Sequence, residues 1–396
     1  MTAAPAGFVA VAGRSDIPEL GVGILGYGFM GRAHTNAYKK IPYIYWPPAA
    51  RPRLVAMCGR HADAVAVQAA RYGYEGYYTD WRQMLADDRI QLFDNSGPHS
   101  MHVEPSLAAL AAGKHVVCEK PMALNSADAL RMVRAARDAG VKHMCGFNYR
   151  FIPAVRLARE LIDRGALGKL YQFRCQYLQE SLHDPDAPLR RAPDHAALKA
   201  GCLVNLGSHV IDMARFLMGE MRSVSALLPT FERTRRLPDG SPTRIEADEA
   251  FAALVEFESG AVGTIEASQV ATGRKNRQYW ELNGSRGTLV FDLERLNELQ
   301  VYLDQGATAE LQGFQDVLVT EAVHPFVKVW WPKGHILGWE HAHINELYHL
   351  VEAIALDKDV APFGATFVDG YRVAVISDAI TESATTGKRM TLQFEA

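Results

Sequence analysis

Apolar residues in the first third of the chain form short runs that alternate with amphipathic segments of helical period. Strands are expected at 22–25, 54–58, 77–79, 90–93, 116–118 and 141–145, and helices at 30–38, 62–72, 81–86, 104–112 and 127–139. Strands that alternate with helices predict a parallel sheet covered by helices on both faces. We therefore expect an α/β domain over residues 20–148, after a loose extension at 1–19. A proline-rich insertion is expected at 41–52.

Beyond residue 148 the pattern changes to segments in which apolar and polar residues alternate one by one, as in half-buried strands. Turns such as Ser259-Gly260 and Asn283-Gly284 separate these segments and are typical of antiparallel hairpins. Helices are expected at 153–164, 340–355 and 370–386. We predict a second domain over residues 149–396, of α+β class, with a large and mainly antiparallel sheet.

Composition narrows the class of protein. Of the 396 residues, 48% are hydrophobic, which can build a sizeable core, and the formal net charge is −3. The lack of a basic excess argues against a nucleic-acid partner, and the short, broken apolar runs argue against a membrane span. Five cysteines are widely spread and show no metal-ligand spacing, so we expect a cytoplasmic protein without a bound metal.

The first expected strand leads into a glycine turn, in which Gly26, Gly28 and Gly31 form the pattern G-x-G-x-x-G. In such a pattern the first glycine allows a sharp turn, the second lets a pyrophosphate approach the backbone, and the third lets the helix pack closely on the strand. The motif alone is weak, because glycine turns between strand and helix are common. Its position between an apolar strand and an amphipathic helix favours a dinucleotide site, in a Rossmann domain, over a purely structural turn.

Two further stretches carry candidate chemistry. Glu119-Lys120-Pro121 follows a strand at its carboxyl end, where ligands bind in open α/β sheets, so the Lys120 ammonium is placed to stabilise an alkoxide. Taken alone, a solvated lysine is the simpler interpretation. On a helix, Asn205, His209 and Asp212 share one face, and histidine is the natural proton acceptor near neutral pH. The alternative is a buried histidine paired with Asp212 for packing.

These motifs, in this order and at these distances, resemble the glucose–fructose oxidoreductase / inositol dehydrogenase (Gfo/Idh/MocA) family over nearly the whole chain, with closer likeness to its sugar dehydrogenases. Other segments that carry the resemblance are Phe147-Asn148-Tyr149-Arg150, Tyr177-Leu178-Gln179, Asp184-Pro185, Pro188-Leu189, His209-Val210-Ile211-Asp212-Met213-Ala214-Arg215 and Phe367-Val368-Asp369-Gly370-Tyr371. The resemblance implies hydride transfer to or from a nicotinamide cofactor, with Lys120 as the catalytic lysine and His209 as the acid/base histidine. It also implies self-association as a dimer or tetramer through the second sheet.

Two groups of binding positions follow from the resemblance. Those expected to hold a polyol substrate are Tyr149, Arg150, Gln179, Asn205 and Asp212. Those expected to contact the cofactor are Gly26, Tyr27, Gly28, Phe29, Met30, Gly31, Gly59, Arg60, Ser96, Gly97, Pro98, His99, His102, Glu119, Lys120 and Asn148.

The chain departs from the family pattern at three places. Asn205 stands where most relatives carry Asp, so His209 must work without that carboxylate. Gly97-Pro98-His99 replaces Thr-Pro-Asn beside the cofactor. Gly59 stands where an acidic residue would bind the ribose of NAD, and Arg60 next to it can meet a 2′-phosphate or stack on adenine. We rank NAD slightly ahead of NADP, with both accepted.

The predicted function is oxidation of a secondary ring hydroxyl on a sugar, glycoside, anhydrosugar or aminocyclitol by an NAD(P)-dependent dehydrogenase. A keto-sugar reductase in natural-product or cell-surface sugar biosynthesis is the alternative, because the sequence does not set the direction. A non-enzymatic dinucleotide sensor would be expected to lack the lysine and histidine pair, and both are present.

Overall fold

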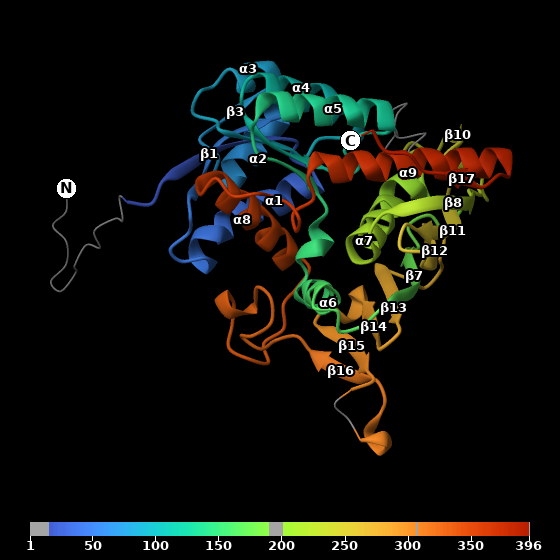
Figure 1. Cartoon of the computed structure of the whole chain (residues 1–396). Helices are drawn as coiled ribbons and strands as arrows, with labels where there is room; N and C mark the ends of the chain where they lie inside the picture. The colour runs from blue at the N-terminus through green and yellow to red at the C-terminus, as the bar shows by residue number, and fades with distance from the viewer. Residues whose placement is uncertain (1–15, 190–200, 306–307, 396) are drawn as a thin grey trace.

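The computed structural model describes residues 16–189, 201–305 and 308–395, which build two large sheets side by side (Figure 1). Most of the expected extension at 1–19 lies outside the described residues, and the first strand begins at Glu19. The first sheet is wholly parallel, in the order β3-β2-β1-β4-β5-β6. Its strands are β1 (Glu19–Leu25), β2 (Arg51–Cys58), β3 (Gly76–Tyr78), β4 (Leu92–Asn95), β5 (His115–Glu119) and β6 (His143–Gly146).

Helices cover this sheet because successive strand residues point to opposite faces. Leu92 of β4 and Val117 of β5 pack in one apolar cluster, whereas their neighbours Phe93 and Val116 pack in another. The helices of this part are α1 (Phe29–Ile44), α2 (Ala62–Tyr72), α3 (Trp81–Leu85), α4 (Val103–Ala111) and α5 (Ser126–Ala139). Helix α1 is longer than expected and takes in part of the proline-rich insertion, because Pro42 near its end removes only one helical hydrogen bond.

A helix from the far end of the chain completes the first of these clusters. Helix α8 (Glu340–Ala355) packs along α1, and its Ile344 and Leu347 share a core with Val22 of β1. The Glu340 carboxylate accepts hydrogen bonds from Asn36 and Lys40 of α1, both at 2.7 Å. The layer around the first sheet therefore draws on both ends of the chain, and α8 lies beside α1 in Figure 1.

The second sheet has nine strands in the order β16-β15-β14-β13-β7-β12-β11-β8-β17. Every pair is antiparallel except β7 with β12, so the mainly antiparallel sheet expected from the sequence is confirmed. The strands are β7 (Leu170–Leu178), β8 (Met221–Leu227), β11 (Ala250–Phe257), β12 (Val262–Ser268), β13 (Arg277–Gly284), β14 (Gly287–Asp292), β15 (Glu298–Leu303), β16 (Gln315–Leu318) and β17 (Met390–Thr391). A separate hairpin joins β9 (Thr234–Arg236) to β10 (Pro242–Arg244).

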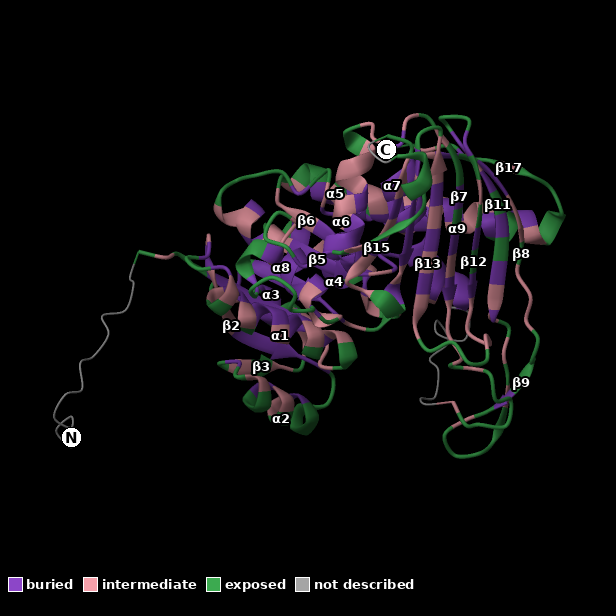
Figure 2. Ribbon diagram, turned by 90° about the horizontal axis from the view of Figure 1, so that it is seen from below, coloured by how far each residue is buried: buried purple, intermediate pink, exposed green. Residues whose placement is uncertain are grey.

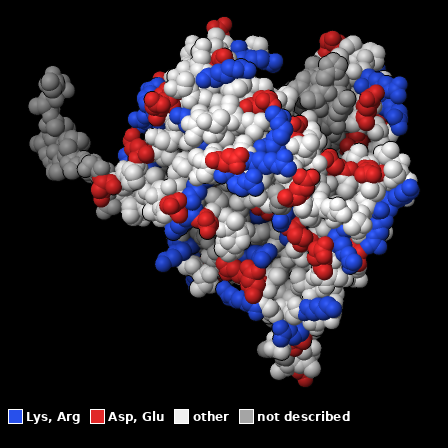
Figure 3. Space-filling model, turned by 45° about the horizontal axis from the view of Figure 1, so that its top comes forward, with Lys and Arg blue, Asp and Glu red and all other residues white. Residues whose placement is uncertain are grey.

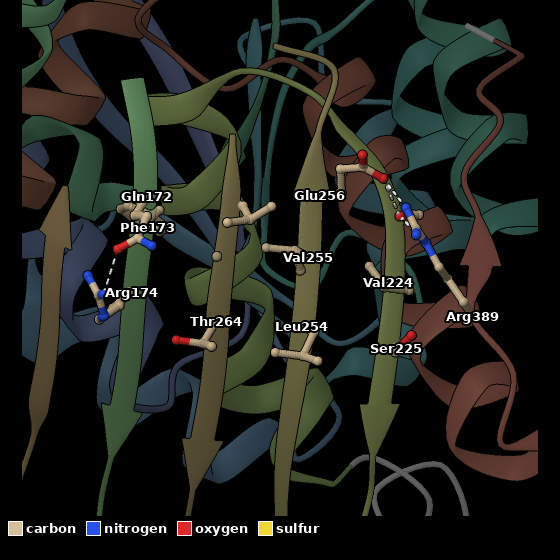
Figure 4. A pocket seen from close by; sticks show the side chains of 13 residues that line it. Gln172, Phe173, Arg174, Val224, Ser225, Leu254, Val255, Glu256, Thr264 and Arg389 are labelled. Atoms are coloured by element: carbon tan, nitrogen blue, oxygen red, sulfur yellow. Dashed lines mark hydrogen bonds and ion pairs between the residues drawn. The ribbon is translucent and has the colours of Figure 1, made fainter. Parts of the chain in front are cut away.

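The two faces of the second sheet differ. One face is buried under α6 (Pro153–Asp163), α7 (Ser208–Met218) and α9 (Phe367–Thr386). Along β11, buried residues alternate with more accessible ones, and Figure 2 shows this banding on the long strands. Figure 4 shows the open face, a shallow hollow of about 420 Å³ that contains Leu254 and is bordered by Glu256, which is ion-paired with Arg389.

Charged side chains of both signs are interspersed over the face of the molecule that Figure 3 shows. Across the part of the chain that the structure describes, no helix is long and apolar enough to cross a membrane.

Candidate active site

The glycine turn between β1 and α1 has the geometry of a phosphate cradle. Gly26 has φ +101°, and a Cβ there would lie 2.5 Å from the Ser96 carbonyl oxygen. A Cβ at Gly31 would lie 2.2 Å from the Gly26 carbonyl oxygen, so strand and helix meet at backbone contact. A Cβ at Gly28 would meet nothing within 4 Å. Two of the glycines are therefore needed by the fold itself, and Gly28 alone faces open space.

The start of α1 supplies the charge that such a cradle needs. Gly28 is the N-cap, and among the described residues no side chain caps this end of α1 and no acidic residue occupies its first turn. The first N–H groups of a helix lack intrahelical partners and carry the positive end of the helix dipole. The residues present therefore fit the pyrophosphate of a dinucleotide.

The ribose position at the end of β2 is closed to an acidic side chain. A Cβ at Gly59 would lie 2.1 Å from the Tyr27 ring, so the tyrosine occupies the space that a carboxylate would need. Arg60 follows on the exposed side of the same turn. The two expected cofactor positions at this end of β2, Gly59 and Arg60, therefore lie next to the glycine turn. The contact with the Tyr27 ring explains why position 59 is glycine.

A cavity of about 610 Å³ opens between the two sheets beside the glycine turn. Twelve of the expected positions line it: Phe29, Met30, Gly97, His99, His102, Glu119, Lys120, Asn148, Tyr149, Gln179, Asn205 and His209. The lining also includes residues that were not expected from the sequence, namely Tyr177, Leu206, Gln269, Lys275, Asn276, Trp339 and His343. A period of two along β7 places Tyr177 on the same side as Gln179 and is a signal that could have found it. Trp339 and His343 gave no signal, because they reach the cavity only through the packing of α8 on α1.

Lys120 enters the cavity from the end of β5. Its Nζ donates a hydrogen bond of 2.9 Å to the backbone carbonyl of Asn205, which joins the two halves of the site. Burial lowers the pKa of Lys120, and the nearby Glu119 carboxylate acts in the opposite direction. The lysine is thus a partly buried donor held by a hydrogen bond at its head group, and the alternative of a fully solvated lysine does not apply.

His209 lines the same cavity as Lys120 and comes from the first turn of α7. Its ring stands 4.7 Å from the ring of Tyr149 and 5.8 Å from that of Tyr177, measured between centroids. Burial lowers the pKa of His209 well below its usual value, and the charges of Lys120 and His343 add to this effect. The imidazole is therefore neutral at physiological pH and able to accept a proton.

The chain before His209 forms a turn of π-helix at Leu203–Gly207, which the sequence did not predict. Regular α-helical spacing would place Asn205, His209 and Asp212 on one face, but only Asn205 and His209 line the cavity, because the Asp212 carboxylate is paired with Arg150. A Cβ at Gly207 would lie 2.7 Å from the Phe251 ring, so this turn is pressed against β11. π-helical turns occur frequently at functional sites.

Arg150 and Asp212 were expected to hold the substrate but lie behind the cavity. Arg150 donates to the two oxygens of Asp212 at 2.9 and 2.5 Å and to Asp369 at 3.1 Å, with Arg150 and Asp212 both buried. A buried charge needs a partner, and each of these side chains finds it in the other. The Arg150–Asp212 pair fixes α7 against the 148–151 turn and so positions His209 from behind. Because Asp212 is paired with Arg150, the alternative in which His209 pairs with Asp212 does not hold.

A second buried network holds Glu119 and was not found from the sequence. His34 of α1 contacts Asp94 at 2.8 Å and Glu119 at 3.1 Å, and Asp94 also accepts from Ser96 and Tyr38. Burial lowers the pKa of His34, but Asp94 and Glu119 outweigh it and raise the pKa well above the usual value. The resulting cation between two carboxylates braces the ends of β4 and β5, and it gives the expected cofactor position Ser96 a structural role.

The loop that follows β4 carries the remaining expected cofactor positions. His102 contacts the carbonyls of Pro121 and Gly97 at 2.7 and 3.1 Å, and so ties this loop to the turn that carries Lys120. Pro98 is the N-cap of the short helix at His99–Met101. Within the described residues, no group of three or more His, Cys, Asp or Glu side chains is arranged to hold a metal ion.

A Rossmann sheet with a phosphate cradle, and a lysine and a histidine that line the cavity beside it, define a nicotinamide-dependent oxidoreductase. Comparison with known proteins agrees: residues 20–147 match the model of an oxidoreductase family with an NAD-binding Rossmann fold, and residues 155–290 match the GFO/IDH/MocA C-terminal domain. The chain belongs to the Gfo/Idh/MocA family, as its motifs predicted.

Three relatives illustrate how close the similarity is. Levoglucosan dehydrogenase of Pseudarthrobacter phenanthrenivorans is 37% identical over 380 residues, which cover 92% of this chain and 96% of that protein. A solved oxidoreductase domain protein from Kribbella flavida is 40% identical with a TM-score of 0.90, covering 96% of this chain and 100% of its own. A levoglucosan dehydrogenase complex with NADH and levoglucosan is 37% identical with a TM-score of 0.90, covering 94% of this chain and 99% of its own.

Proposed function

We propose that the protein is an NAD-dependent dehydrogenase that oxidises a secondary ring hydroxyl of an uncharged sugar, glycoside or anhydrosugar. The observation that carries this proposal is the placement of Lys120 and His209 in one cavity with Phe29 and Met30 of the glycine turn. An oriented cation, a neutral base and a dinucleotide cradle are the three components that alcohol oxidation requires.

In the proposed reaction the substrate hydroxyl lies between Lys120 and His209. The Lys120 ammonium donates a hydrogen bond to the hydroxyl oxygen and stabilises the negative charge that develops there. His209 accepts the hydroxyl proton, and the carbon–oxygen bond becomes a carbonyl as the ring carbon loses its hydrogen with both electrons. The bound nicotinamide supplies the acceptor for that hydride. Asn205 holds Lys120 through its backbone carbonyl, so this contact does not need the Asp that most relatives carry.

The lining of the cavity supports an uncharged polyol as substrate. Opposite the cofactor side it presents the amides Gln179, Gln269 and Asn276, each of which can both donate and accept hydrogen bonds. Lys275, at the same end, is ion-paired with Glu180 and so is already neutralised. Hydroxyl groups match such a surface, whereas a carboxylate or phosphate would find no unpaired cation there except Lys120, within the described residues.

Two observations favour NAD and an anhydrosugar as the first pair to test. Solved complexes of levoglucosan dehydrogenase hold NADH, and one of these complexes also holds levoglucosan. In this chain the Tyr27 ring covers Gly59, at the position where the ribose of the cofactor is expected. Arg60, the next residue, can stack on adenine.

All five cysteines are buried and free, as expected for an enzyme of the reducing cytoplasm.

We further propose that the chain self-associates through the open face of its second sheet. Leu254 and Val262 are 65% and 50% exposed on neighbouring strands there, and short side chains such as Ser225 and Thr264 surround them. A second copy would cover this apolar centre.

The decisive experiment incubates the enzyme with NAD or NADP and a panel that contains levoglucosan, D-glucose, methyl glucosides and myo-inositol, and follows the absorbance of reduced nicotinamide. The reverse reaction, with NADH and the corresponding ketones, establishes the preferred direction. We expect turnover of at least one neutral carbohydrate with NAD, and a rate lower by about a hundredfold or more with His209→Ala under the same conditions. An enzyme that binds NADH stoichiometrically but oxidises no member of the panel would refute the proposal.

A further inference from the structure

A chain of hydrogen bonds runs along the substrate side of the cavity. The hydroxyls of Tyr149 and Tyr177 lie 2.8 Å apart, and the Tyr177 hydroxyl lies 2.8 Å from Oδ1 of Asn276. The Gln179 amide nitrogen donates to the same Oδ1 at 2.7 Å. All four side chains line the cavity, and Tyr149 and Tyr177 are almost fully buried.

The direction of donation along this chain is fixed by the oxygen of Asn276 at one end. Because Asn276 Oδ1 can only accept, the Tyr177 proton is used there, and the Tyr177 oxygen is left to accept the proton of Tyr149.

We propose that this chain makes the enzyme selective for a substrate with a free hydroxyl beside the reacting one. Tyr149, its proton committed to Tyr177, can only accept from a ligand, and its ring stands 4.7 Å from that of His209. The Oδ1 atom of Asn276 already accepts two hydrogen bonds, so Asn276 offers a ligand only its N–H groups. A hydroxyl satisfies Tyr149 by donating to it, whereas the methyl ether of the same hydroxyl leaves two acceptors facing each other. Tyr177 is then a specificity-determining residue that acts through Tyr149.

This inference rests on the proposed function, and its test uses levoglucosan and its mono-O-methyl ethers. Binding is measured as well as turnover, by the change in protein fluorescence when each compound is added to the enzyme with NADH. Wild type should bind one particular ether about threefold to tenfold more weakly than levoglucosan, the range expected for one unmade hydrogen bond. In Tyr177→Phe the Tyr149 proton is released towards the cavity, so the penalty for that ether should disappear. The change should fall on KM more than on kcat.

Two further variants keep the result interpretable. Tyr171→Phe on the same strand removes a hydroxyl from a half-exposed ring outside the cavity lining and should leave the penalty unchanged. Asn276→Asp keeps two accepting oxygens for Tyr177 and Gln179, so it should preserve the penalty although it loses the outer donor.

A wild-type enzyme that oxidises levoglucosan but binds every ether equally well would overturn the inference and leave the proposed function standing. A penalty that persists in Tyr177→Phe, or that disappears in Asn276→Asp, would also overturn it. Absence of turnover with the whole carbohydrate panel would instead count against the proposed function.

Discussion

Replacement of Gly28 by valine should abolish tight cofactor binding and leave the fold intact. A Cβ at this position meets nothing within 4 Å, so the added side chain occupies only the space from which a pyrophosphate reaches the start of α1. Loss of two charge-assisted hydrogen bonds, at roughly 1.5 kcal/mol each, weakens binding by about 3 kcal/mol, or about a hundredfold. The cost to stability is at most about 1 kcal/mol, because valine is a poorer N-cap than glycine.

Gly31→Ala is the matched control, because it should show the opposite result. Its Cβ would lie 2.2 Å from the Gly26 carbonyl oxygen, a backbone atom that cannot move without bending the turn. Overpacking of this kind costs about 1–3 kcal/mol. The melting temperature of the ligand-free protein should therefore fall by several degrees in Gly31→Ala, and less in Gly28→Val. Fluorescence titration with NADH and thermal unfolding without it measure the two quantities separately. Wild-type affinity in Gly28→Val would show that the dinucleotide binds elsewhere.

Four further outcomes are expected. Lys120→Ala and His209→Ala should each lower kcat by about a hundredfold or more while NADH still binds, and near-normal rates in both would remove their proposed roles. Arg60→Ala should weaken NADH and NADPH equally in paired titrations; a selective loss of NADPH by about tenfold or more would reveal a phosphate contact instead. Leu254→Lys should reduce the mass measured by light scattering, and a monomeric wild type would contradict self-association through the open face. Burial lowers the pKa of His143 from 6.5 to about 4, so stability present above pH 6.5 should be lost as the pH falls towards 4, by roughly 3 kcal/mol. Urea unfolding at several pH values should show this loss, and His143→Asn, which cannot take up the proton, should make the loss smaller by that amount.

The sequence predicted local order better than it predicted side-chain partners. Strand and helix periods gave the parallel sheet and the mainly antiparallel one, because apolar periodicity follows directly from which face is buried. The glycine turn could also be interpreted from the sequence, because close backbone contacts at Gly26 and Gly31 leave no room for a side chain. Lys120 and His209, which the structure places in the lining of one cavity, were noticed in the sequence because they stand in short motifs.

The remainder depended on contacts between distant segments. Arg150 and Asp212 looked like polar substrate residues because a sequence does not show that they neutralise each other. The π-helical turn at Leu203–Gly207 was not predicted, because nothing in its composition distinguishes it from an α-helix. Trp339 reaches the site only because α8 packs on α1, across about three hundred residues of chain.

That packing of α8 has a consequence for building hybrid enzymes within the family. A graft that exchanges residues 20–148 alone would pack the donor's residue 22 and the donor's α1 against the native Ile344 and Leu347. It would also replace Lys40, the ion-pair partner of the native Glu340. The exchangeable unit is therefore discontinuous: residues 20–148 and the α8 segment must be inherited together. Hybrids that carry both pieces should fold with the cofactor preference of the donor, whereas single-crossover hybrids should be recovered mainly as insoluble protein.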